Sequence, residues 1–147
     1  MIERILVASD DSPAGLEAVR WAVDLAGTYT AALRVLHVLD GAEVTSALRP
    51  WAPQGISDRR REAGQSLFRH VSGLAASAGV TAETVELSGE PAVRILEQAR
   101  AWPADLVVIG RGEPPGTGGP WVGKETRMVL EFADQPVLVV PRRQAAP

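Results

Sequence analysis

The chain has 147 residues, of which 46% are hydrophobic and 22% charged, and its formal net charge is −3. This length is typical of one domain, so we expect a single domain over residues 1–147. The charge balance disfavours nucleic acid as a partner, and the absence of cysteine excludes disulfides, thiolate metal sites and a cysteine nucleophile. The start of the chain lacks the features of a secretion signal, and no apolar run reaches the roughly 20 residues of a membrane helix. We therefore expect a cytoplasmic protein without a membrane partner.

The first predicted element is a strand over residues 5–8, whose continuous apolar sequence is typical of a strand buried on both faces. After it, apolar side chains recur every three or four positions, which predicts an amphipathic helix. Ser12 is the expected N-cap of this helix and Pro13 its first residue, and Gly27 is expected just past its end.

Strands and helices continue to alternate along the rest of the chain. Further strands are predicted over residues 33–39, 80–87, 105–110 and 136–141. Further helices are predicted over 58–78, 91–102 and 122–133, with Ser57 as N-cap of the second helix. A long loop is predicted over 40–56. This alternation predicts an α/β fold, in which right-handed crossovers place helices on both faces of a mainly parallel sheet. Ligands of such sheets bind beyond the carboxyl ends of the strands, so candidate site residues follow the first, second and fourth strands.

Polar residues follow the first strand at this edge. Ser12 is expected to cap the helix while Asp10 faces the crevice. A metal site built on Asp10 and Asp11 alone is disfavoured, because adjacent residues at a strand end point in opposite directions.

Residues 110–126 join the fourth strand to the last helix through six glycines. They include Gly123 and Lys124 at the helix start, where free backbone N–H groups favour a phosphate. The same segment partly matches a P-loop, but Glu125 stands where a P-loop needs a hydroxyl for Mg²⁺, and Pro120 removes an N–H. A P-loop phosphotransferase is therefore disfavoured, and a surface loop without a ligand is the simpler alternative.

The histidines and tryptophans carry little catalytic signal. His37 is expected to be a hydrogen-bonded structural residue and His70 to lie beside the apolar face of a helix, so no hydrolase triad is predicted. Trp51 and Trp121 are expected in or beside loops at the crevice, where they line a pocket, form a subunit contact or anchor a loop. Trp21 and Trp102 are expected to pack from helices onto the sheet or its rim.

Five short segments occur in a distinctive order: ILVASDDS at 5–12, LHV at 36–38, GEP at 89–91, DLVVIG at 105–110 and PVLVV at 136–140. In this order they resemble the universal stress protein family over residues 2–141. The resemblance implies a five-stranded sheet of order 3-2-1-4-5, similar to that of Rossmann-like adenine nucleotide alpha hydrolases.

The ATP-binding branch of that family carries G-x2-G-x9-G-S/T after the fourth strand. Gly110 and Gly123 look like its first and third glycines, whereas Glu113 stands at the second glycine and Lys124 at the hydroxyl. The resemblance implies that Asp10 contacts the nucleoside, that three residues frame the adenine by backbone and that the loop residues approach the phosphates. The implied site comprises Ala8, Ser9, Asp10, Val38, Gly110, Gly112, Gly123 and Lys124.

These expectations describe a stress-response protein that binds ATP or a related adenine nucleotide, which Mg²⁺ could accompany, with at most slow hydrolysis and no tightly bound metal. The resemblance also implies a homodimer through antiparallel pairing of the last strand, at Val137, Leu138, Val139 and Val140, and an unidentified protein partner. The alternative is a dimeric interaction module of the same fold that binds no nucleotide, in which Pro114, Pro115 and Pro120 close the phosphate loop.

Overall fold

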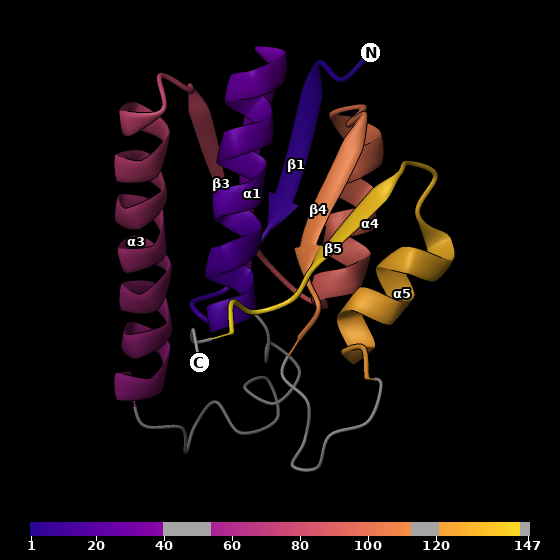
Figure 1. Cartoon of the computed structure of the whole chain (residues 1–147). Helices are drawn as coiled ribbons and strands as arrows, with labels where there is room; N and C mark the ends of the chain where they lie inside the picture. Colours follow the sequence, from indigo (N-terminus) through magenta and orange to yellow (C-terminus); the bar gives the residue numbers. More distant parts are fainter. Residues whose placement is uncertain (40–53, 113–120, 145–147) are drawn as a thin grey trace.

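The computed structural model describes residues 1–39, 54–112 and 121–144, without the side chains of residues 54–60. Strands and helices alternate along these residues (Figure 1). The strands are β1 (Arg4–Ala8), β2 (Ala32–Leu39), β3 (Ala82–Ser88), β4 (Leu106–Gly110) and β5 (Val137–Val140). The helices are α1 (Pro13–Tyr29), α3 (Gln54–Ser77), α4 (Pro91–Ala101) and α5 (Lys124–Phe132).

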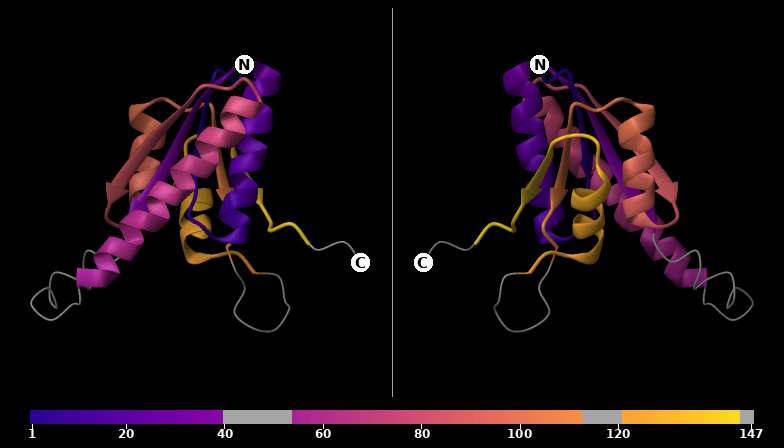
Figure 2. Two further views of the ribbon diagram at one scale, coloured as in Figure 1. Left: turned by 90° about the vertical axis from the view of Figure 1, so that its left-hand side faces the viewer. Right: turned by 90° about the vertical axis from the view of Figure 1, so that its right-hand side faces the viewer.

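The five strands form one sheet of order β3-β2-β1-β4-β5 in which every neighbouring pair is parallel. Helices α1 and α3 cover one face, and α4 and α5 cover the other (Figures 1 and 2). The predicted fold class and strand order are thereby confirmed. Strands β3 and β5 form the two edges.

Strand β1 lies in the middle of the sheet and is buried on both faces. Ile5, Leu6 and Val7 have no exposed surface. Val7 packs in a cluster with residues of α1 and α3, whereas Leu6 packs in a second cluster with residues of α4 and α5. Full burial of one such side chain contributes about 1.5–3 kcal/mol, so the predicted central strand links both halves of the core.

Helix α1 extends beyond its predicted end. Gly27 lies inside the helix, and the chain turns at Thr30, whose φ of 53° is left-handed. The N–H of Ala31 donates to the carbonyl of Ala26 at 3.0 Å, which completes this turn. A glycine inside a helix costs about 1 kcal/mol relative to alanine. The helix nevertheless continues to Tyr29, because the left-handed Thr30 caps it with its N–H on the Ala26 carbonyl, so the prediction of a stop at Gly27 is wrong.

Helix α3 begins at Gln54, three residues before the predicted cap Ser57. It ends at Ser77, followed by Gly79 with a φ of 68° and a hydrogen bond of 2.8 Å from the N–H of Val80 to the carbonyl of Ala75. This turn delays β3 to Ala82. Residues 40–53, which hold most of the predicted loop and Trp51, lie outside the described residues.

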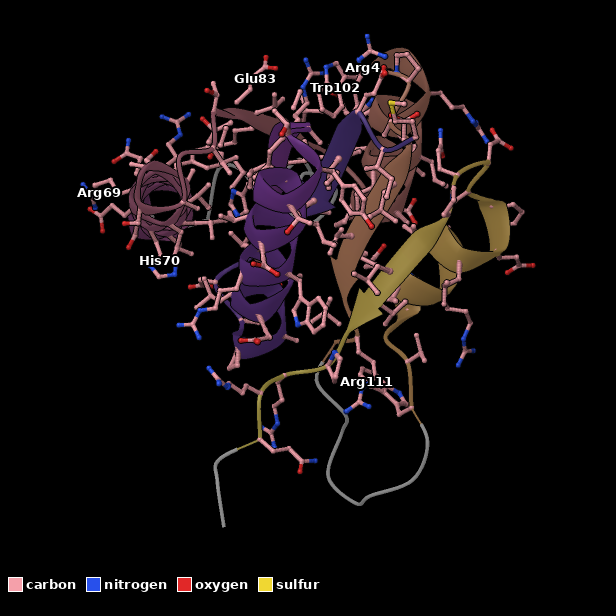
Figure 3. All side chains as sticks on the ribbon, turned by 45° about the horizontal axis from the view of Figure 1, so that its top comes forward. Arg4, Arg69, His70, Glu83, Trp102 and Arg111 are labelled. Carbon is pink, nitrogen blue, oxygen red and sulfur yellow. The ribbon has the colours of Figure 1, made fainter. Side chains whose placement is uncertain are left out.

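The tryptophan and histidine side chains that were predicted on helices differ in how far they are buried. Trp21 is 49% exposed, so it packs only in part, whereas Trp102 packs on the core and lies 4.5 Å from the guanidinium carbon of Arg34. His70 is exposed on the outer side of α3 (Figure 3). Within the part of the chain that the structure describes, no helix is long and apolar enough to cross a membrane.

Candidate functional site

A cavity of about 470 Å³ lies beyond the carboxyl ends of β1, β2 and β4, at the lower edge of the sheet in Figure 1. Small-molecule pockets commonly measure about 300–1,000 Å³. Helices α1, α4 and α5 all begin at this cavity, and Ala63 of α3 contributes to its wall. Its lining includes all eight residues predicted as a site: Ala8, Ser9, Asp10, Val38, Gly110, Gly112, Gly123 and Lys124.

Asp10 is held over the start of α1 by hydrogen bonds. Its Oδ1 accepts from the N–H of Ser12 at 3.0 Å and from the Ser12 hydroxyl, and the same hydroxyl oxygen accepts from the N–H of Gly15 at 3.1 Å. A Cβ at Gly15 would lie 2.5 Å from Asp10 Oδ1, so this arrangement requires glycine there. Ser12 therefore caps α1, as predicted, and Asp10 stays exposed on the cavity wall.

Gly110 brings the end of β4 against the first turn of α1. A Cβ at this position would lie 2.9 Å from the carbonyl carbon of Ala14, which leaves no room for any other residue. On its other side, the Gly110 carbonyl accepts a hydrogen bond of 2.7 Å from the hydroxyl of Thr126, which is 3% exposed. Gly110 thus joins the starts of α1 and α5 at one point of the cavity.

The two ends of the loop between β4 and α5 meet at Arg111 and Gly123, which form the neck of the loop. The N–H of Gly123 donates to the carbonyl of Arg111 at 2.9 Å, and the N–H of Arg111 donates to the carbonyl of Val140 at 2.8 Å. Gly112 has a φ of 92°, and a Cβ there would lie 3.2 Å from the Trp121 ring. Trp121 therefore anchors the neck and is not part of the cavity lining. Residues 113–120, with the predicted Glu113, Pro114, Pro115 and Pro120, lie outside the described residues.

The start of α5 presents hydrogen-bond donors to the cavity. The first intrahelical bond runs from Arg127 N–H to the Gly123 carbonyl, so the N–H groups of Lys124, Glu125 and Thr126 have no partner within the helix. Such N–H groups, with the positive end of the helix dipole, favour an anion. Lys124 is the only lysine or arginine among the described residues that line the cavity.

Glu125 has a role that the sequence did not indicate. Its Oε2 accepts a hydrogen bond of 3.1 Å from the N–H of Ala92, in the first turn of α4. The N-cap residue of α4, Glu90, makes no side-chain capping bond. Glu125 therefore caps α4 from a neighbouring helix, 33 residues away in the chain, and sequence spacing carries no signal for such a contact.

His37 also lines the cavity, from the α3 side of the sheet. It is 8% exposed, and its Nδ1 lies 3.5 Å from Glu86 Oε2 without forming a hydrogen bond. Phe68 contacts the imidazole edge-on, and a Cβ at Gly64 would lie 3.0 Å from Nδ1. His37 is buried as expected, but the predicted hydrogen bond is absent at Nδ1.

The fold and the cavity agree with a family comparison. The model of the Universal stress protein family matches residues 1–141 of this chain. The chain belongs to this family. The sheet order and the segments that carry the resemblance are therefore family features.

Individual family members match over most of their length. Universal stress protein YxiE of Bacillus subtilis is 32% identical over 147 residues, covering 95% of this chain and 99% of that protein. A universal stress protein of Methanocaldococcus jannaschii is 30% identical over 142 residues, covering 97% and 84% respectively. Among solved structures, universal stress protein UspA from Lactobacillus plantarum superposes with a TM-score of 0.83 at 28% identity, covering 95% of this chain and 97% of that one.

Proposed function

We propose that this universal stress protein binds an adenine nucleotide in the cavity at the carboxyl ends of β1, β2 and β4, without efficient turnover. One observation carries the proposal: the ends of β1, β2 and β4 contribute to one cavity, although they lie up to about a hundred residues apart in the chain. The start of α5, with Lys124, lines the same cavity. In this arrangement, adenine lies against the backbone of Ala8, Ser9 and Val38, Asp10 accepts from the ribose, and the phosphates face Lys124.

Proteins of the same fold have been solved with adenine nucleotides. Universal stress proteins have been solved in complex with cAMP, with dAMP in Archaeoglobus fulgidus, and a family protein of Arabidopsis thaliana with AMP bound. These chains are 18–22% identical to this one, so they support the fold, and the ligand proposal depends on the cavity itself.

The hydroxyl groups of the cavity hold its wall in place. Ser9 donates to the Asp10 carbonyl at 2.8 Å, Ser12 donates to Asp10 Oδ1, and Thr126 donates to the Gly110 carbonyl. These bonds fix the residues that the nucleotide would contact, which fits a binding site. We therefore propose a nucleotide-responsive protein that acts in the cytoplasm by passing its state to a protein partner.

The nucleotide-free interaction module remains the second candidate. The hydrogen bond from Gly123 to Arg111 favours it, because that bond removes one N–H from the phosphate end of the cavity. Both candidates use a homodimer, which we propose to form through antiparallel pairing of β5 at the edge of the sheet.

Calorimetric titration of the full chain with ATP, ADP and AMP separates the two candidates. Saturable binding that weakens about tenfold or more in Lys124→Ala supports the nucleotide site, since one charge-assisted hydrogen bond contributes about 1.5–3 kcal/mol. Arg127→Ala is the matched control, because Arg127 is exposed on the same helix and does not line the cavity. Absence of heat at millimolar nucleotide would favour the interaction module.

A further inference from the structure

His37 is a buried polar residue without a hydrogen bond at Nδ1 among the described residues. It is 8% exposed and lines the cavity near the end of β2. Because Nδ1 has almost no accessible surface, Nε2 is the ring nitrogen that can reach a ligand in the cavity. A buried polar group without a partner is costly, which makes this imidazole a candidate for contact with the ligand.

The surroundings of Nδ1 favour a proton on that nitrogen. His37 on β2 pairs in register with Glu86 on β3, and Nδ1 lies 3.5 Å from Glu86 Oε2. A carboxylate attracts an N–H and repels a nitrogen lone pair, so the neutral imidazole carries its proton on Nδ1. Nε2 then keeps its lone pair and can only accept a hydrogen bond.

Helix α3 encloses the histidine and the glutamate. Phe68 contacts the imidazole edge-on, with 6.1 Å between the ring centroids. Gly64 crosses directly over both side chains: a Cβ there would lie 2.5 Å from Glu86 Oε2 and 3.0 Å from His37 Nδ1. Glycine permits this close approach, so α3 holds Nδ1 against the carboxylate.

A second hydrogen-bond acceptor lies beside His37. Ala8 pairs in register with Leu36, and the N–H of Ser9 donates to the Leu36 carbonyl at 3.0 Å, which places Ser9 next to His37. The Ser9 hydroxyl donates its proton to the Asp10 carbonyl at 2.8 Å, so its remaining lone pairs can only accept. Ser9 also lines the cavity. This part of the cavity therefore presents acceptors and fits a ligand group that donates.

The order of the strands places the base of a nucleotide at this position. Lys124 lies beyond β4, Asp10 follows β1, and His37 lies near the end of β2. A nucleotide whose phosphates face Lys124 and whose ribose meets Asp10 extends its base toward β2. We propose that His37 selects the base by accepting a hydrogen bond at Nε2 from the 6-amino group of adenine. The assignment rests on the proposed nucleotide function; it makes His37 a specificity-determining residue and Glu86 a positioning residue.

A 6-oxo purine lacks the donor that this acceptor requires. Hypoxanthine carries a carbonyl oxygen where adenine carries its amino group, and that oxygen would face the lone pair of Nε2. A site built to hydrogen-bond an N–H of its ligand discriminates strongly against an analogue without it. The test is calorimetric titration of the full chain with ATP and with ITP at pH 8, where imidazole side chains are ordinarily neutral. We expect the unmodified chain to bind ATP at least about tenfold more tightly than ITP.

Variants of the pair assign this preference to the imidazole. His37→Phe removes the acceptor and keeps a ring against Phe68, so it should bind ATP and ITP within about threefold of each other. Glu86→Gln removes the charge that fixes the tautomer and should lower the preference for ATP at least about threefold. Glu83→Gln, on the same strand, is the matched control and should keep the preference of the unmodified chain. Circular dichroism checks that each variant is folded.

Nitrogen-15 NMR of the imidazole rings gives a readout that packing alone would not move. The chain has two histidines, so His70→Gln assigns the signals. We expect the proton of His37 on Nδ1, and a shift of the Nε2 resonance when ATP is added. A proton on Nε2, equal binding of ATP and ITP, or an unchanged preference in His37→Phe would overturn the inference and leave the nucleotide function standing. No binding of either nucleotide by the unmodified chain at millimolar concentration would overturn both.

Discussion

Polar side chains do different work at the two ends of the sheet: at one end they fix the starts of helices, and at the other they tie two strands together. At the carboxyl end, Asp10, Glu125 and Thr126 fix the starts of helices around an open cavity. At the amino end, Asp105 accepts hydrogen bonds from the N–H groups of Glu3 and Arg4 at 2.8 and 2.9 Å, which tie β1 to the start of β4.

A hollow of about 510 Å³ also exists at the amino end, with Trp102 and Glu83 on its wall. Figure 3 labels these two residues. Among the described elements no helix begins there, because each helix follows a strand of the parallel sheet, starts at the carboxyl edge and runs back toward the amino edge. Of these two hollows, only the one at the carboxyl edge also contains helix N–H groups that have no partner within the helix. Volume therefore does not distinguish the two ends, whereas the direction of the helices does.

The largest expected effect is at the close contact that forms the carboxyl end. Gly110→Val places a side chain within 3.0 Å of the Ala14 backbone and should destabilise the fold by about 3 kcal/mol or more. Urea unfolding measures this loss. Gly73→Ala is the control, because nothing lies within 4 Å of a Cβ at Gly73 in α3, and it should be neutral or slightly stabilising. Equal behaviour of the two variants would contradict the packing described for Gly110.

The free edge at β5 gives a second large effect, on assembly. The carbonyls of Pro136 and Val140 accept from β4, so alternation directs the N–H of Val139 away from β4. Val139→Pro removes that N–H and should convert the proposed dimer to a monomer while leaving the sheet intact. Light scattering after size exclusion measures the mass. Val139→Thr keeps the N–H and should remain dimeric; a dimeric proline variant would place the interface elsewhere.

A smaller effect tests the cap between helices at the cavity. Glu125→Ala removes the partner of the Ala92 N–H and should lower stability by about 1 kcal/mol. The same change removes a negative charge near the phosphates and should tighten ATP binding, opposite in sign to Lys124→Ala. Glu131→Ala, exposed on the same helix, should change neither quantity. Weaker ATP binding by the Glu125 variant would indicate that this carboxylate supports the ligand.

The smallest effect concerns the amino end and depends on pH. The hydrogen bonds from the N–H groups of Glu3 and Arg4 hold the pKa of Asp105 below its usual value of 3.8. The lowered pKa means that these bonds stabilise the fold above the ordinary aspartate pKa, and that this contribution is lost as the pH falls through the lowered pKa. Asp105→Asn should therefore lower the melting temperature slightly at pH 7, with a shrinking difference from the unmodified chain toward pH 2. An undiminished difference at pH 2 would contradict this role of Asp105.

Particular residues explain why some predictions succeeded. Ser12 followed by Pro13 predicts the start of α1 because a helix start depends on neighbouring residues only. Gly27 misled the prediction of its end, because the left-handed cap forms at Thr30, a residue type that rarely adopts this conformation. For His37, no partner for Nδ1 is found among the described residues, and its neighbours Glu86, Phe68 and Gly64 come from β3 and α3, which only the packing brings together.

The sequence by itself determined the order of strands and helices, the central buried strand, the cap at Ser12 and eight of the residues that line the cavity, because these follow from local periodicity, local turn chemistry and a family resemblance. Only the tertiary structure decided that Glu125 caps α4, that Gly110 meets Ala14 and that the Thr126 hydroxyl donates to the Gly110 carbonyl. These contacts join residues from separate crossovers. Their distances depend on how the helices pack on the sheet, and that packing is a property of the whole chain.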